Sequence, residues 1–172
     1  MEKKLYFAPM EGITGYIYRN AHAEFFGGCD AYYAPFITPV ENEKLSLKCL
    51  RDIEPEKNRV NLRVQVLTNS SDAFFRFEDR IRGMGYDYVN INLGCPSGTV
   101  VKKDRGAGFL RNTDGLCDFL KNVFESTSLT VSVKTRVGFF DSDEFDALME
   151  IYNRFPLDSL IIHPRTRQDY YR

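Results

Sequence analysis

The 172-residue sequence has no CxxC pair, no histidine cluster and no long apolar run. The four cysteines are Cys29, Cys49, Cys95 and Cys117. Their wide separation excludes a zinc ribbon and a dithiol redox motif, and it favours a reduced cytoplasmic chain. Only two histidines occur, His22 and His163, and no HExxH motif is present, so we predict no metal site.

Charge and hydropathy exclude further classes of protein. No apolar run approaches the roughly 18 residues that a membrane-spanning helix needs, and Leu5–Met10 is too short for the core of a signal peptide. A formal net charge of −1 gives no support to a general polyanion-binding surface. Neither GxGxxG nor GxxxxGK[ST] occurs, which excludes a Rossmann dinucleotide fingerprint and a P-loop.

Short β-rich runs alternate with longer helical patterns along the whole chain. The predicted strands are Leu5–Ala8, Ala31–Ala34, Asn61–Val66, Tyr88–Asn92, Thr130–Thr135 and Ser159–His163. The predicted helices are Gly15–Phe26, Asn42–Leu50, Ser71–Met84, Thr113–Phe124 and Ser142–Phe155. Ser71 and Ser142 precede acidic residues and are predicted N-caps. This alternation predicts an α/β fold with a parallel sheet covered by helices.

Polar and reactive residues gather where the predicted strands end. They are Gln65, Asn92, Cys95, Lys134, Arg136, His163 and Arg165. In a parallel βα array the carboxyl ends of all strands lie on one face, where ligands bind. The interval between the fourth and fifth strands is the longest and predicts an enlarged loop, which we expect Arg105-Gly106-Ala107-Gly108 to shape.

Cys95 differs in context from the other cysteines. It follows a buried strand between Gly94, which permits a sharp turn, and Pro96, which stiffens the exit. We therefore predict that Cys95 is presented on a loop, whereas the other three cysteines are small buried hydrophobes. Lys134 ends an apolar strand, where an ammonium group is costly unless it meets an anion. His22 is predicted to be a surface or half-buried helix residue.

Five motifs occur in order along the chain. They are Ala8-Pro9-Met10-Glu11-Gly12 with Thr14, Val64-Gln65, Asn92-Leu93-Gly94-Cys95-Pro96, Val133-Lys134-Thr135-Arg136-Val137-Gly138, and Ile162-His163-Pro164-Arg165-Thr166. Together they make the sequence resemble the tRNA-dihydrouridine synthases, flavin enzymes that reduce the C5–C6 double bond of particular uridines in tRNA. The resemblance implies FMN as cofactor, NADPH as reductant and tRNA as partner.

The resemblance also implies roles for single residues. Cys95 would be the general acid that protonates C5 while reduced flavin delivers hydride to C6, and a thiol with a pKa of about 8.5 is largely protonated near neutrality. The residues that match flavin-contacting positions are Pro9, Met10, Gln65, Lys134 and His163. Those that match positions near the target nucleotide are Asn92, Arg136 and Arg165.

Family members have an eight-stranded (β/α)8 TIM barrel followed by a small helical domain that binds tRNA. Compared with that pattern, residues 1–172 correspond to a partial FMN-binding TIM-barrel domain of about six βα units, without strands seven and eight and without the helical domain. We therefore expect a shortened, weakly active or inactive form that binds flavin weakly. Self-association through the open edges of the first and sixth strands is a further expectation.

Two basic clusters give modest support to RNA contact. They are Lys102, Lys103 and Arg105, and Arg165, Arg167 and Arg172 with Tyr170 and Tyr171 interleaved. Two other functions stay open at this point. One is a small-molecule pyrimidine flavin oxidoreductase of the dihydroorotate dehydrogenase type, and the other is a non-catalytic fragment that binds RNA or a partner.

Overall fold

A computed structural model describes residues 3–39 and 47–171 and contains one six-stranded sheet in the order β1-β2-β3-β4-β5-β6. The strands are β1 (Tyr6–Phe7), β2 (Ala31–Tyr33), β3 (Leu62–Val66), β4 (Tyr88–Leu93), β5 (Thr130–Gly138) and β6 (Leu160–Thr166). Every neighbouring pair is parallel. All six predicted strands are confirmed, but β5 and β6 run three residues beyond their predicted ends. Arg136 and Arg165 therefore lie within strands.

Helices connect the strands in regular alternation. The α-helices are α1 (Tyr16–Phe25), α2 (Leu47–Asp52), α3 (Ser71–Arg82), α4 (Gly98–Val101), α5 (Thr113–Ser126) and α6 (Phe145–Tyr152). Short 3-10 helices are η1 (Pro55–Lys57), η2 (Gly106–Arg111) and η3 (Ser142–Glu144). The helix predicted at 42–50 lies partly outside the described residues. Within residues 3–39 and 47–171, every helix is too short or too polar to cross a membrane.

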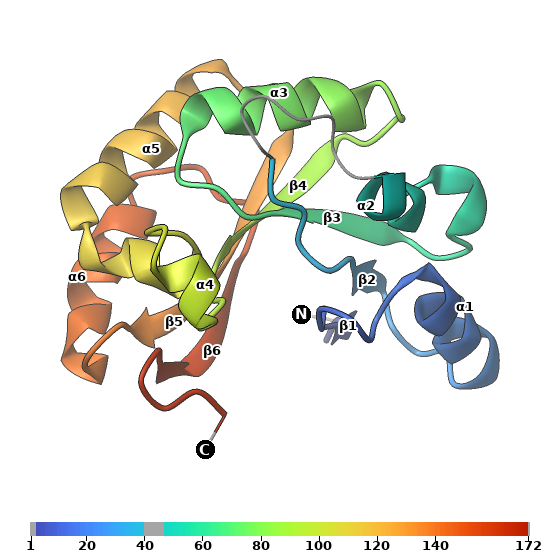
Figure 1. Cartoon of the computed structure of the whole chain (residues 1–172), viewed down its shortest axis with the longest axis horizontal. Coiled ribbons are helices and arrows are strands. Elements are labelled where there is room, and N and C mark those ends of the chain that lie inside the picture. The colour runs from blue at the N-terminus through green and yellow to red at the C-terminus, as the bar shows by residue number, and fades with distance from the viewer. Residues whose placement is uncertain (1–2, 40–46, 172) are drawn as a thin grey trace.

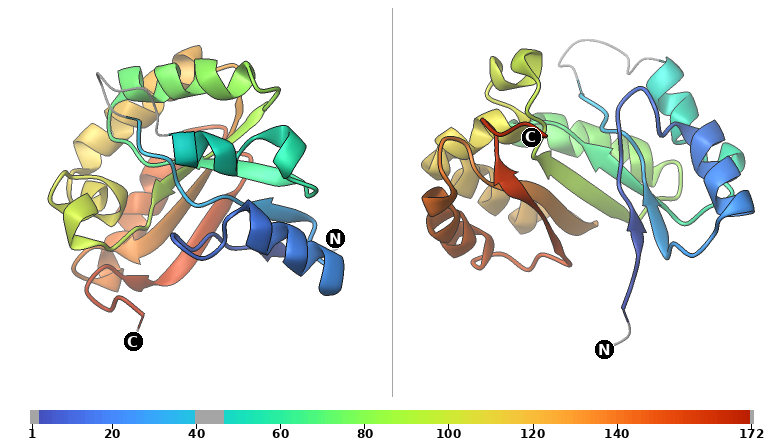
Figure 2. Two further views of the ribbon diagram at one scale, coloured as in Figure 1. Left: turned by 45° about the vertical axis from the view of Figure 1, so that its right-hand side comes forward. Right: turned by 90° about the horizontal axis from the view of Figure 1, so that it is seen from below.

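The sheet curls into a half-barrel, with the helices on its outer side (Figures 1 and 2). The two edge strands are β1 and β6, and Figure 2 shows them at opposite ends of the curved sheet. Six parallel strands with alternating helices correspond to part of a (β/α)8 TIM barrel, so the predicted fold class is confirmed.

The two faces of the sheet differ in chemistry. Outward-facing side chains, such as Val64, Ile91 and Val133, are fully buried in one hydrophobic core with Phe74 of α3 and Leu120 of α5. Because side chains alternate along a strand, the residues between these positions face the inside of the half-barrel. In β4 and β5 these inner residues are polar or charged: Asn90, Asn92, Ser132, Lys134 and Arg136.

Both predicted N-caps are displaced by one residue. Ser70 caps α3, because its Oγ accepts a hydrogen bond from the Ala73 backbone amide at 3.3 Å. Asp141 caps η3 and forms a capping box with Glu144. In both cases the predicted serine, Ser71 or Ser142, is already the first helical residue, whereas an N-cap needs the extended backbone that precedes it.

A buried arginine fastens α1 to the end of α2 and to the residues that follow it. The Arg19 side chain is fully buried and pairs with Asp52 at 3.1 Å. Its guanidinium also donates to the carbonyl oxygens of Thr14 and Asp52 and to Asn58 Oδ1, at 2.6–2.8 Å. On the same helix His22 is half-buried and lies 3.1 Å from the Tyr32 hydroxyl, which confirms its predicted place. These contacts hold the β1–α1 unit against the rest of the sheet.

Candidate active site

The Cys95 loop, residues Gly94 to Ser97, directly follows β4 and is held from two sides. Asn92 Oδ1 accepts hydrogen bonds from the backbone amides of Gly94 at 3.1 Å and Cys95 at 2.9 Å. On the other side the Ala107 amide donates to the Cys95 carbonyl at 3.0 Å. The prediction that Cys95 stands on a loop is confirmed.

The predicted enlarged loop after β4 contains α4 and η2, and a glycine in it lies directly against Cys95. Gly106 has a φ of +55°, and a Cβ atom there would stand 2.8 Å from the Cys95 carbonyl oxygen and 3.0 Å from its Cβ. Only glycine allows both this left-handed conformation and this close approach. The glycine-rich run therefore shapes the loop, as predicted.

Burial by itself does not distinguish Cys95 from the other cysteines. Cys29, Cys95 and Cys117 are all half-buried, so Cys29 and Cys117 are less buried than predicted, although Cys117 does pack against the hydrophobic core. The side chain of Cys49 lies outside what the structure describes. What sets Cys95 apart is its place on a loop held by Asn92 and Ala107. Burial raises the pKa of the Cys95 thiol above its ordinary value. The nearby Arg136 guanidinium opposes that rise, but burial is the stronger effect.

Alkylation tests the state of this thiol. In a chain whose Cys29, Cys49 and Cys117 are replaced by serine, we expect the rate of Cys95 alkylation by iodoacetamide to rise with pH through a midpoint above about 8.5, the pKa of an unperturbed thiol. The thiolate is the reacting species, so a raised pKa moves the profile to higher pH. Mass spectrometry measures the modified fraction, and a midpoint at or below that of free cysteine would contradict the assignment.

Two cations stand at successive inward positions of β5. Lys134 pairs in register with Asn92 of β4, and Arg136 pairs with His163 of β6. Burial lowers the pKa of Lys134, and the charge of Arg136 lowers it further. In the described part of the chain, neither cation has a carboxylate within ion-pair distance. Burial also lowers the pKa of Arg136, but the charge of Asp169 opposes that shift, whereas a partly buried ammonium without an ion-pair partner, such as that of Lys134, favours an anionic ligand.

His163 is half-buried beside these cations. Burial lowers the pKa of its imidazole, and the positive charges of Arg136, Lys134 and Arg165 lower it further. The ring is therefore neutral near pH 7 and serves as a hydrogen-bonding group with no charge of its own.

A chain of buried amides crosses the inside of the half-barrel. Asn92 Nδ2 donates to Gln65 Oε1 at 2.8 Å, and Gln65 Nε2 donates to Asn90 Oδ1 at 2.6 Å. Asn90 Nδ2 then donates to Ser132 Oγ at 2.7 Å. The chain fixes the amide orientations of Gln65 and Asn92. It thereby supports the Cys95 loop, whose backbone amides donate to Asn92 Oδ1. Sequence reasoning missed Asn90 and Ser132, although polar residues at alternate positions of apolar strands were the available signal.

The remaining predicted site residues lie around this centre. Pro9 and Met10 follow β1, where the Met10 carbonyl accepts from the Ile13 and Thr14 amides at 3.1 and 3.0 Å. The charge of Glu11, in the same loop, also raises the pKa of Cys95. Arg165 is half-buried in β6.

The two basic clusters are only partly free to contact a ligand. Arg105 donates to Asn69 Oδ1 at 3.4 Å, while Lys102 and Lys103 are exposed. Arg167 donates to the Tyr170 hydroxyl at 3.0 Å and lies over the Phe139 ring. Tyr171 is exposed, and Arg172 lies outside the described residues.

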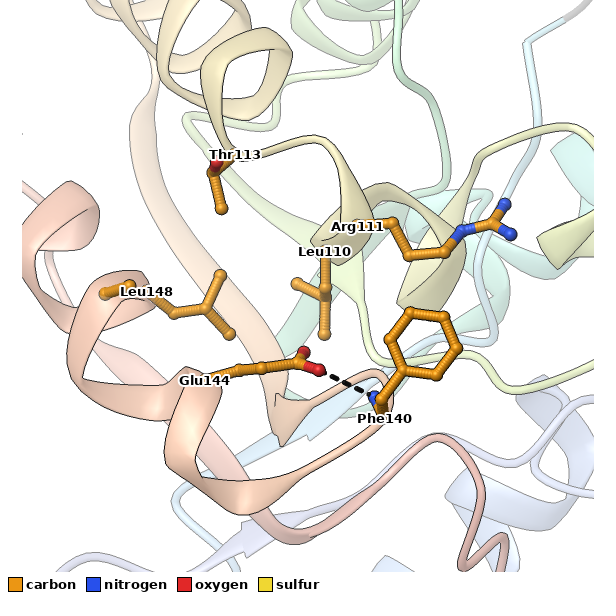
Figure 3. Close-up of a pocket in the computed structure, with 7 residues that line it drawn as sticks. Leu110, Arg111, Thr113, Phe140, Glu144 and Leu148 are labelled. Atoms are coloured by element: carbon orange, nitrogen blue, oxygen red, sulfur yellow. Dashed lines mark hydrogen bonds between the residues drawn. The ribbon is translucent and has the colours of Figure 1, made fainter.

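One small cavity lies away from the predicted site residues (Figure 3). It has a volume of about 210 Å³ and is lined by Leu110, Arg111, Thr113, Phe140, Glu144, Ala147 and Leu148. Ligand sites usually occupy about 300–1,000 Å³, and none of the predicted site residues lines this cavity. Across residues 3–39 and 47–171, no cluster of three or more His, Cys, Asp or Glu side chains could hold a metal ion.

Comparison with known proteins finds related sequences. The family model described as dihydrouridine synthase matches residues 6–172. A probable tRNA-dihydrouridine synthase of Staphylococcus epidermidis is 26% identical over 172 residues, which cover 94% of this chain and 50% of that protein. Proteins with the same description from Staphylococcus aureus and Helicobacter pylori are each 25% identical, and they are covered to 49% and 52%. The chain thus spans about half the length of the curated relatives it matches.

Proposed function

Because the chain belongs to the dihydrouridine synthase family, we propose that it carries the catalytic region of an FMN-dependent enzyme that reduces uridine in tRNA. NADPH is the proposed reductant. The observation that carries the proposal is geometric: the Cys95 loop follows β4 beside Lys134 and Arg136 of β5, and within residues 3–39 and 47–171 neither cation forms an ion pair with a carboxylate. Family membership also favours tRNA over a dihydroorotate-like substrate.

Cys95 supplies the proton in the proposed reaction. Bound FMN, once reduced, would supply the hydride that adds to C6 of the uracil ring. The electron pair of the C5–C6 double bond then shifts toward C5, where it must accept a proton. A thiol whose pKa is raised by burial stays protonated at neutral pH and can give that proton to C5, leaving a thiolate that solvent reprotonates.

We propose that the inner face of the sheet binds the flavin ring. Pro9, Met10, Gln65, Lys134 and His163 would hold FMN, with the Lys134 ammonium offsetting the negative charge of the reduced ring. The amide chain keeps Gln65 in one orientation through its hydrogen bonds with Asn90 and Asn92. The absence of a carboxylate beside Lys134, in the region that the structure describes, fits an anionic partner.

We assign the uridine side of the site to Asn92, Arg136 and Arg165. Exposed Lys102, Lys103 and Tyr171 lie on neighbouring loops and would contact the phosphates and bases of tRNA. Since tRNA is the proposed substrate, the cytoplasm is the proposed place of action.

Exposed apolar side chains at the sheet edges support self-association of a partial barrel domain spanning residues 1–172. Those near β1 and α1 are Leu5, Tyr6, Ile17, Phe25 and Phe26, and Ile162 lies on β6. Among the residues that the structure describes, β1 and β6 each pair with a strand on one side only. An edge strand with apolar neighbours is prone to pair with another chain.

Flavin binding tests the proposed role of Lys134. We expect the chain to bind FMN weakly, and Lys134→Met to raise the Kd about tenfold, the effect of losing one charge-assisted contact. Quenching of FMN fluorescence during titration gives the Kd. Lys121→Met is the matched control, because Lys121 is exposed on α5. Equal affinities of the parent chain and Lys134→Met would contradict the assignment, and co-purification of FMN at one equivalent would contradict weak binding.

A further inference from the structure

Arg136 joins the ends of three neighbouring strands. It lies within β5 and is almost fully buried, with 1% of its surface exposed. Its Nε donates to the Gly94 carbonyl, in the Cys95 loop after β4, at 2.7 Å. Its Nη1 donates to the carbonyl oxygens of Thr166 at 2.8 Å and Tyr170 at 2.9 Å, at the end of β6. One side chain therefore holds the Cys95 loop and the Thr166–Tyr171 segment together.

The Thr166–Tyr171 segment needs this support. The Asp169 carboxylate closes its first turn by accepting from the Thr166 amide and hydroxyl, at 2.8 and 2.7 Å. Tyr170 has a φ of +53°, a left-handed conformation that costs free energy in a non-glycine residue. The hydrogen bond from Arg136 to the Tyr170 carbonyl fastens the strained residue. A change in the conformation of this segment would therefore alter the hydrogen bonds of Arg136.

The hydrogen bonds of Arg136 depend on the planar arrangement of its guanidinium donors. Its three hydrogen bonds all go to backbone carbonyls, and no carboxylate among residues 3–39 and 47–171 pairs with it. A guanidinium presents its donors in a rigid planar fork, so it can reach Gly94 on one side and Thr166 on the other. A lysine ammonium is a single point on a flexible stem and cannot span both sides in the same way.

We propose that Arg136 is a positioning residue that couples the Cys95 loop to the Thr166–Tyr171 segment. Through the Gly94 carbonyl it holds the thiol in place, and through the Thr166 and Tyr170 carbonyls it links that placement to the exposed Tyr171. The inference rests on the proposed function in one respect, since it takes Cys95 as the reacting group. It adds that a ligand which moves the Thr166–Tyr171 segment also moves Cys95.

The test measures how accessible Cys95 is. In the chain whose other three cysteines are serine, the limiting rate of alkylation at high pH reports exposure of the thiolate, independent of its pKa. Arg136→Gln and Arg136→Lys are each expected to raise this rate about tenfold, the factor for losing one charge-assisted hydrogen bond. Arg76→Gln is the matched control, because Arg76 is exposed on α3, away from the Cys95 loop and the Thr166–Tyr171 segment. It should leave the rate unchanged.

A second variant tests the coupling without altering the buried arginine. Asp169 is exposed, so Asp169→Ala is expected to keep the fold while it loosens the Thr166 turn. The coupling predicts a several-fold rise in the Cys95 limiting rate, although Asp169 does not contact the Cys95 loop. Unchanged rates in Asp169→Ala and in the Arg136 variants, or a shift in the pH midpoint alone, would overturn the proposal. The alkylation rates do not depend on dihydrouridine formation. A failure of this proposal can therefore be distinguished from a failure of the proposed function.

Discussion

Replacing Cys95 by alanine is expected to lower the rate of dihydrouridine formation by about 10²–10⁴, the usual contribution of a positioned general acid. Hydride addition at C6 leaves the electron pair at C5, and alanine offers no proton to receive it. The affinity for FMN should stay near that of the parent protein, because Cys95 lies on the loop after β4 and Lys134 holds the proposed flavin side.

The assay for Cys95 needs a protein of family length as well as the chain itself. We would use a fusion of residues 1–172 to the C-terminal half of the Staphylococcus epidermidis relative, with the unfused chain alongside. Dihydrouridine is measured by mass spectrometry of bulk tRNA after incubation with FMN and NADPH. Cys117→Ala is the matched control, because Cys117 is half-buried on α5. Undiminished product formation by Cys95→Ala would remove the proposed proton donor.

Gly106→Ala is expected to destabilise the fold by about 2–4 kcal/mol, because it combines a left-handed backbone with overpacking. The added methyl group would meet the Cys95 carbonyl oxygen at 2.8 Å, and this backbone atom cannot rotate away as a side chain could. Relief requires the Cys95 loop to move and lose its hydrogen bond from the Ala107 amide. The substitution therefore affects both the stability of the fold and the placement of the thiol.

Urea unfolding measures the effect, and Gly98→Ala provides the matched control. Gly98 belongs to the same enlarged loop, but a Cβ there meets no atom within 4 Å and its φ is outside the left-handed region. Its replacement should change the free energy of unfolding by about 0.5 kcal/mol or less, as for ordinary surface positions. Equal stabilities of Gly106→Ala and Gly98→Ala would show that the close approach to Cys95 has no energetic consequence.

Strand positions could be read from local patterns, but strand lengths could not. The sequence pattern predicts that β5 ends at Thr135, one residue before Arg136. The strand continues to Gly138 because the guanidinium of Arg136 finds carbonyl partners at the ends of both neighbouring strands. The same partners are remote in sequence, which is why no local pattern indicated them.

In the candidate site, too, local sequence indicates some features, whereas contacts between strands are not indicated. The motif around Cys95 indicated a loop, because Gly94 and Pro96 act on the adjacent backbone. The amide chain through Gln65, Asn90 and Ser132 was not foreseen, because its members lie on three different strands. Each amide looked like an isolated polar residue until the strand register brought it beside the next.

By itself, the sequence determined the alternation of strands and helices, the loop that presents Cys95, and the family to which the chain is similar. These features depend on side-chain periodicity, turn residues and short motifs, all of which act within a few residues. Only the tertiary structure decided the contacts of Arg136, the close approach of Gly106 to Cys95, and the orientation of the buried amides. These depend on hydrogen-bond geometry and packing between residues that are brought together only when the parallel sheet curls.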